Sequence, residues 1–200
     1  MKILTCSAQL QRLEEILRKS LPLTLPVFGA VLNINRGNPG QFEVLVDKWP
    51  EFGAVLARPS GEGATGFVGP WGHWGALGLD LGMLRAGLGY WAHWKQGFGW
   101  PAPGVSVGSL SPSHVDLLND TWPYGGNARS RRFLAEILGR FPQVCLQDGS
   151  GQPIAWVLTD HFGTGTHSYT LPEHRQRGHM RVALTVAAQR AHARGFPTFG

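Results

Sequence analysis

Residues 169–180 read YTLPEHRQRGHM and join a β-rich segment to a long helix that we predict from about Gly178 to Arg194. The start of a helix exposes unpaired backbone N–H groups and the positive end of the peptide dipoles, so it binds a phosphate well. Gly178 lets a ligand approach the main chain closely, and Arg175 and Arg177 add positive charge. The stretch therefore predicts a diphosphate site. The alternative is a basic, solvated loop in which the glycine serves only the turn.

The sequence around this motif predicts an ordered domain at residues 109–200. Its apolar residues follow the order β-α-α-β-β-β-α, counted from a short strand at 105–110. The predicted helices are 111–122, 128–140 and 178–194, and the later predicted strands are 144–147, 153–159 and 167–171. Residues 196–200 are expected to begin a further strand.

The first sixty residues predict a smaller α/β unit. Leu10, Leu13 and Leu17 recur at helical spacing behind Ser7, a plausible helix cap, and this favours a helix over 7–19. Strands are expected in the segments that are rich in β-formers, at 26–34, 42–46 and 54–57.

Residues 61–108 differ from the segments on either side. They hold 14 of the 28 glycines and five of the eight tryptophans, and no ordinary core pattern runs through them. Residues 77–88 are too short and too often interrupted by charge and glycine to span a membrane. We therefore expect three parts: a partial N-terminal domain at 1–60, a Gly/Trp-rich irregular insert at 61–108, and the domain at 109–200.

The composition narrows the classes of ligand. A net charge of +5 favours an anionic ligand, but Arg129, Arg131 and Arg132 are expected on the solvated face of a helix, so nucleic-acid binding is not expected. Cys6 and Cys145 lie far apart without a CxxC pair, and we expect both to be reduced, buried thiols. No histidine pair has metal-ligand spacing with a carboxylate, so no metal site is expected.

The order of strand, Arg-x-x-Gly-x and helix resembles the coenzyme A pyrophosphate motif of the GNAT superfamily, although that motif usually ends in Gly or Ala where Met180 stands. Further stretches are similar to glycine N-acyltransferases and glycine N-acyltransferase-like proteins, namely 17–22, 33–39, 47–50, 125–127 and 169–175. The resemblance covers residues 1–59 and 109–200. It implies an α/β (α+β) fold of the GNAT acyltransferase type, incomplete at the C-terminus, with a partial N-terminal α/β domain.

This resemblance implies an enzyme that moves an acyl group from an acyl-CoA thioester to the amino group of glycine or a similar small amino acid. Acyl-CoA would be a co-substrate, not a permanently bound cofactor. The implied cofactor-binding residues are Tyr169, Thr170, Leu171, Arg175, Gln176, Arg177, Gly178, His179 and Met180. The family also implies mitochondrial residence, which no clear presequence supports; otherwise the protein would be cytoplasmic.

The implied base is where the chain departs from the family. Attack by an amine requires that a base take its proton, and Thr164 falls where the family is expected to carry a glutamate. His167 is the nearest titratable substitute, although a lone strand histidine is more often structural, and Asp160 is a weaker candidate that fits a turn cap. The family would also add a strand and a helix after Gly200. The alternative function is a catalytically inactive CoA-binding or interaction protein of the same family.

Overall fold

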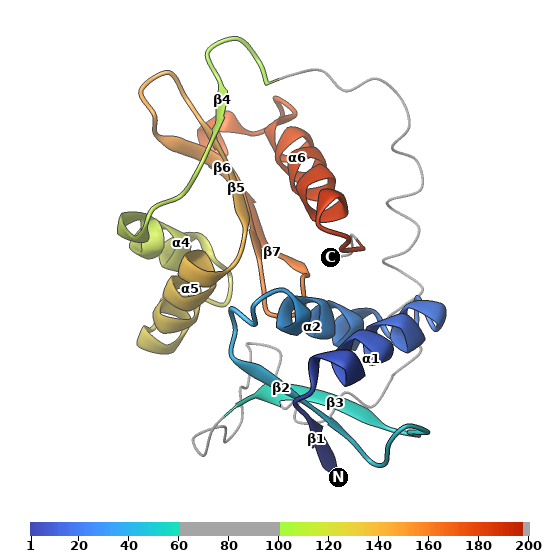
Figure 1. Ribbon diagram of the computed structural model, residues 1–200. Helices are drawn as coiled ribbons and strands as arrows, with labels where there is room; N and C mark the ends of the chain where they lie inside the picture. Colours follow the sequence, from blue (N-terminus) through green and yellow to red (C-terminus); the bar gives the residue numbers. More distant parts are fainter. Residues whose placement is uncertain (61–100, 198–200) are drawn as a thin grey trace. The chain divides into compact units, whose positions relative to one another are not determined.

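Two antiparallel sheets, one in each of two compact units, carry the fold (Figure 1). The computed structural model describes residues 1–60 and 101–197. The first unit comprises Met1–Ala86 with His161–Gly163, and the second comprises Gly87–Asp160 with Thr164–Gly200. The predicted insert at 61–108 lies mostly outside the described residues, so the division into three parts stays a prediction.

The first unit packs two helices on one face of a three-stranded sheet (Figure 1). The strands are β1 (Lys2–Leu4), β2 (Phe42–Val46) and β3 (Val55–Pro59), and the helices are α1 (Ser7–Lys19) and α2 (Leu25–Asn35). The strand order is β1-β2-β3 and both pairings are antiparallel. The structure confirms the helix predicted at 7–19 and the strand predicted at 42–46.

The prediction of a strand at 26–34 is wrong, because this segment lies within α2. The run is almost entirely apolar, and the helix buries residues on several sides, including Phe28, Val31 and Leu32. A short apolar run of this kind does not distinguish a buried strand from a buried helix by its periodicity. Pro26 in the first turn is a helix-start signal that outweighs the β-formers after it.

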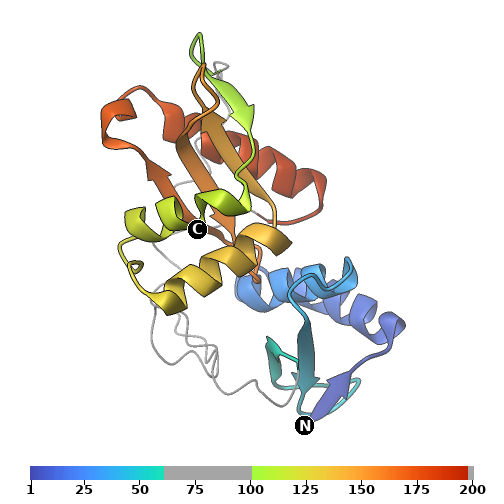
Figure 2. The same cartoon turned by 90° about the vertical axis from the view of Figure 1, so that its left-hand side faces the viewer.

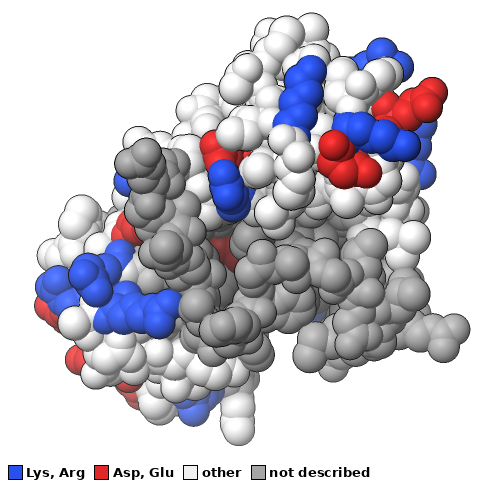
Figure 3. Space-filling model, turned by 90° about the horizontal axis from the view of Figure 1, so that it is seen from below, with Lys and Arg blue, Asp and Glu red and all other residues white. Residues whose placement is uncertain are grey.

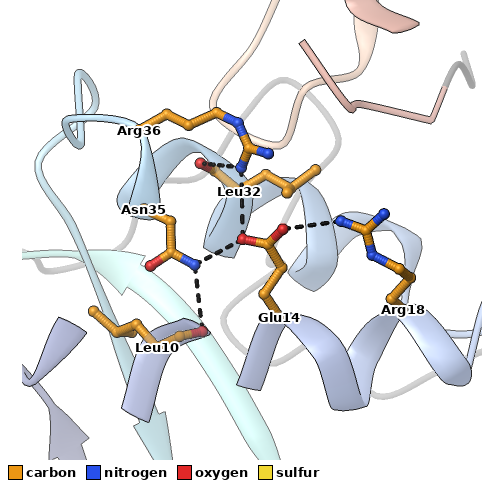
Figure 4. A network of polar contacts seen from close by, with 6 residues as sticks. All are labelled: Leu10, Glu14, Arg18, Leu32, Asn35 and Arg36. Atoms are coloured by element: carbon orange, nitrogen blue, oxygen red, sulfur yellow. Dashed lines mark hydrogen bonds and ion pairs between the residues drawn. The ribbon is translucent and has the colours of Figure 1, made fainter. Parts of the chain in front are cut away.

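Polar contacts join α1 to the end of α2 (Figure 4). The Glu14 carboxylate accepts hydrogen bonds from Arg18 Nη2 at 3.0 Å and from Asn35 Nδ2 at 2.8 Å. Arg36 Nη1 lies 3.6 Å from the same carboxylate, and Asn35 Nδ2 also donates to the Leu10 carbonyl at 3.3 Å. The Glu14 carboxylate therefore contacts one side chain on α1, one on the last residue of α2 and one on the residue that follows α2.

The second unit has a four-stranded antiparallel sheet with helices on both faces (Figures 1 and 2). The strands are β4 (Ser106–Gly108), β5 (Gln143–Gln147), β6 (Pro153–Thr159) and β7 (Gly165–Thr170), in that order across the sheet. On one face lie α4 (Val115–Thr121) and α5 (Ala128–Arg140), and on the other lies α6 (His179–Ala193). Two 3₁₀ turns, η1 (Pro112–His114) and η2 (Pro172–His174), precede α4 and α6.

Each face of this sheet has its own apolar core. The core under α4 and α5 contains Leu118, Leu134 and Trp156, and the core under α6 contains Leu146, Ile154 and Ala183. The structure confirms the predicted order β-α-α-β-β-β-α, with the bounds of α5 and β6 as the sequence predicted them.

The two cysteines lie in opposite environments. Cys145 is buried in the core under α4 and α5, and burial raises the pKa of its thiol to about 12. Cys6 immediately precedes α1 and is exposed, so the expectation that both thiols are buried is wrong for Cys6. Its position outside the first turn of the helix keeps it off the apolar face that Leu10 and Leu13 form.

Candidate functional site

The edge strand β7 leads into the predicted phosphate motif. Among the described residues β7 pairs only with β6, so its other edge has no strand beside it. The Leu171 N–H donates to the Ile154 carbonyl at 3.0 Å, which directs that amide toward β6. Because N–H groups alternate in direction along an antiparallel strand, the Thr170 N–H and C=O face the open edge. Of Tyr169, Thr170 and Leu171, the predicted ligand-binding residues at this strand end, only Thr170 directs its backbone N–H to the open edge.

Gly178 ends the turn and caps α6 in a left-handed conformation. Its φ is 78°, and Gln176 two residues earlier also has a positive φ of 62°. No side chain in the described part of the chain caps the start of α6, and the first helical hydrogen bond runs from the Val182 N–H to the Gly178 carbonyl at 3.2 Å. A Cβ placed on Gly178 would meet no atom within 4 Å among the described residues. The start of α6 thus has no side-chain cap among the described residues and has room beside Gly178, and a phosphate site requires both.

The two arginines of the motif differ in their contacts. Arg175 Nε donates to the Thr170 carbonyl at 3.1 Å, and its guanidinium carbon lies 5.3 Å from the centre of the Tyr169 ring. Arg177 is exposed. The structure thus brings Tyr169, Thr170 and Arg175 together where β7 ends, next to the turn that opens α6.

The first two residues of α6 face inward. His179 is buried on the same side of the helix as Ala183, and its ring centre lies 6.2 Å from that of His174. The pKa of His179 is lowered, first by burial and then by the positive charges of His174 and Arg177. Met180 packs against the core under α6, so its side chain serves the sheet packing. Of these two residues, only the backbone amides are directed to the helix start.

Thr164 and Asp160 close the connection between β6 and β7. The Thr164 N–H donates to Asp160 Oδ1 at 2.9 Å, and the Asp160 N–H donates to the Thr164 carbonyl at 3.1 Å. Asp160 therefore caps a turn, as the alternative interpretation of this residue held. Thr164 precedes β7, whereas the phosphate motif follows it, so the strand separates the two predicted parts of the site.

His167 lies inside the core under α4 and α5. Its Nε2 is 2.6 Å from the Leu118 carbonyl, its ring stacks on Trp122 with the centres 5.7 Å apart, and it meets Trp156 edge-on. A carbonyl oxygen only accepts, so Nε2 carries the hydrogen and Nδ1 holds the lone pair. Burial lowers the pKa of His167, and the Leu118 carbonyl partly opposes this shift. The imidazole is therefore neutral at neutral pH and is held by tertiary contacts.

Two buried polar atoms near the end of β7 have no hydrogen-bond partner among the described residues, Thr170 Oγ1 and Trp156 Nε1. An unpaired buried polar group costs about 1–3 kcal/mol, so native proteins keep few of them. Thr170 thus has an outward backbone N–H, which fits the carbonyl groups of an extended amide-containing ligand, and a buried hydroxyl that has no partner among the described residues. The sequence marks Trp156 only by its place in the middle of a predicted strand, so its role near the site was not predictable.

Charged groups elsewhere in the described residues are partly paired with one another. Arg131 forms two hydrogen bonds to the Asp116 carboxylate, at 2.6 and 3.3 Å, so part of the predicted arginine cluster is paired. Figure 3 shows basic and acidic side chains interspersed on the face that it presents. Within residues 1–60 and 101–197, no three His, Cys, Asp or Glu side chains are grouped to hold a metal ion. None of the helices in these two ranges is long and apolar enough to cross a membrane.

Comparison with known proteins gives one family. The sequence model of the aralkyl acyl-CoA:amino acid N-acyltransferase family matches residues 1–66 and 93–142. Glycine N-acyltransferase of Bos taurus is 29% identical over 261 aligned positions, which cover 100% of this chain and 88% of the relative. The glycine N-acyltransferase-like protein Keg1 of Mus musculus is 29% identical, covering 98% of this chain and 88% of the relative. Human glycine N-acyltransferase is 28% identical, and the match covers 95% of this chain and 85% of the relative.

A solved structure illustrates the shared fold. The X-ray structure of a Drosophila protein from a structural genomics consortium superposes with a TM-score of 0.61 at 11% identity. The match covers 99% of this chain and 86% of that chain. At this identity the likeness concerns the arrangement of helices and strands and not the chemistry.

Proposed function

Because the chain belongs to the aralkyl acyl-CoA:amino acid N-acyltransferase family, we propose that it moves an acyl group from acyl-CoA to the amino group of glycine or a similar small amino acid. The finer choice of glycine follows the names of its relatives from Bos taurus and Homo sapiens. The observation that carries the proposal is the start of α6, where Gly178 leaves the first amides uncapped beside the end of an open strand.

The residues that would hold acyl-CoA come from β7 and the turn after it. The first amides of α6 would bind the diphosphate, with Arg175 and Arg177 supplying positive charge. The Thr170 N–H would orient the extended arm of the ligand along the strand edge. When bound, acyl-CoA supplies the thioester carbonyl that an amine attacks. The features of this chain that best fit such a ligand are the uncapped start of α6 and the outward Thr170 N–H.

The proton of the incoming amine needs an acceptor. His167 is the proposed base, because its imidazole is neutral and keeps a lone pair on Nδ1. Threonine at position 164 cannot take this role at neutral pH. The acyl transfer would therefore depend on a histidine that also holds the Leu118 carbonyl.

A second candidate function is a catalytically inactive protein that binds CoA. The burial of His167 and its hydrogen bond to a backbone carbonyl favour it, since both give the ring a structural role. The two functions share the phosphate site and differ in whether a base reaches the amine.

Calorimetric titration with acyl-CoA, followed by a glycine-dependent assay for released thiol, separates the two functions. Binding with thiol release supports the transferase, and binding without release supports the silent binder. Absence of both contradicts the proposed site. We also propose mitochondrial residence, and localisation of the tagged full chain to the cytosol would contradict it.

A further inference from the structure

The guanidinium of Arg175 is held at the open edge of β7 although the side chain is exposed. Its Nε donates to the Thr170 carbonyl at 3.1 Å, and its guanidinium carbon lies over the Tyr169 ring, 5.3 Å from the ring centre. These two contacts leave Nη1 and Nη2 without a partner among the described residues. A fixed pair of donors of this kind suits a phosphate oxygen pair, which arginine binds through two parallel hydrogen bonds.

A buried aromatic neighbour holds the Tyr169 ring in place. Its ring stacks on Trp156 with the centres 5.5 Å apart and the planes 27° from parallel. The two residues are cross-strand partners on β6 and β7, and Trp156 is fully buried in the core under α4 and α5. A continuous stack therefore runs from the core to the surface, in the order Trp156, Tyr169 and Arg175.

We propose that Tyr169 is a positioning residue for Arg175. The ring holds the guanidinium at the end of β7, next to the turn that opens α6, before a ligand binds. A long side chain fixed before binding loses less freedom when it contacts a phosphate. Tyr169 thereby raises affinity for a diphosphate-bearing ligand through Arg175 and without contacting that ligand. This inference rests on the proposed function, because it assumes that the ligand is CoA or its thioester.

Two substitutions separate this role from simple core packing. Tyr169→Phe keeps the aromatic face, whereas Tyr169→Leu keeps apolar volume and removes the face. A cation–aromatic contact at an exposed site corresponds to a change of about two- to fivefold in affinity. We expect the Leu variant to bind CoA that much more weakly in titration calorimetry, and the Phe variant to match the parent protein.

The same titrations in an Arg175→Gln background test whether Tyr169 acts through Arg175. There Tyr169→Leu should cause no further loss of CoA affinity. An equal loss in both backgrounds, or no loss in the parent background, would overturn the positioning role. If the parent protein does not bind CoA, the proposed function is wrong and this inference with it.

A measurement without ligand keeps the two failures distinct. The Arg175 Nε–H proton should show an NMR ring-current shift in the parent protein and in Tyr169→Phe. The proton should lose this shift in Tyr169→Leu. The other amide resonances of this variant show whether it is folded. An unshifted Nε–H in the parent protein would contradict the stack whatever the affinity for CoA.

Discussion

Replacement of Gly178 by aspartate tests the phosphate site directly. The new carboxylate would stand at the capping position of α6, where it accepts the same amides that a diphosphate needs and repels its charge. With roughly 5 Å between the carboxylate and one phosphate charge, the repulsion is about 1 kcal/mol in water and about 3 kcal/mol at an effective dielectric constant of 20. CoA affinity should therefore fall about five- to 150-fold.

The backbone cost of this substitution must be separated from its charge. Gly178 has a φ of 78°, and a residue with a Cβ in this conformation costs about 1–2 kcal/mol. Gly126 offers a matched control, because its φ is 80° and a Cβ there also meets nothing within 4 Å. Gly126→Asp should lower the unfolding free energy by a similar amount and leave CoA affinity unchanged.

Titration calorimetry with CoA at two salt concentrations gives the result. The loss caused by Gly178→Asp should shrink at high salt, because exposed charges are screened. Unchanged affinity in Gly178→Asp, or an equal loss in Gly126→Asp, would refute the placement of the diphosphate at the start of α6.

Five further substitutions, at four positions, test the fold and the proposed base. His167→Ala should abolish glycine-dependent thiol release and leave CoA affinity nearly intact. It should also lower the unfolding free energy by about 2–4 kcal/mol. An unchanged rate of thiol release would show that His167 has only a structural role. Because burial lowers the pKa of His167, stability should fall as the pH drops below the ordinary histidine pKa, and His167→Gln should reduce that slope in pH-dependent urea melts. Asn127→Ala removes the side-chain acceptor of two α5 amides, at 2.9 and 3.0 Å, and should cost about 1 kcal/mol in urea unfolding. Gly29→Ala should destabilise the protein, because the new Cβ would overlap the Phe162 carbonyl. Gly139→Ala should stabilise it by up to about 1 kcal/mol, because the new Cβ on this helix meets no described atom within 4 Å. Equal shifts of the melting temperature in the two variants would contradict this difference.

Local sequence signals predicted the second unit better than the first. The helix at 128–140 has an apolar face at regular spacing, and the strand at 153–159 lies between a turn and a loop, so neighbours in the chain determine both. The segment 26–34 carries no polar face, and its state depends on being covered on several sides. The three-residue strand β1 is too short to show a period and forms because β2 pairs with it.

The candidate site also has parts that the sequence predicts and parts that depend on tertiary contacts. The turn at 175–178 was predictable because glycine and the start of a helix are visible in the sequence. The hydrogen-bond partner of His167, the Leu118 carbonyl, lies 49 residues away on α4, so no pattern within the strand predicts this contact. The hold of Tyr169 on Arg175 also depends on the return of the chain through η2. Tertiary contacts of this kind determine which predicted residues are free to act.

The contrast between the two cysteines provides an experimental handle. At mildly alkaline pH a maleimide dye should react with the exposed Cys6 and spare Cys145, whose thiol stays protonated until about pH 12. A single fluorophore can therefore be attached beside α1 without mutagenesis. Pulsed alkylation of the second thiol then counts the molecules whose β5 core has opened, so one reagent both tags the native protein and times its unfolding.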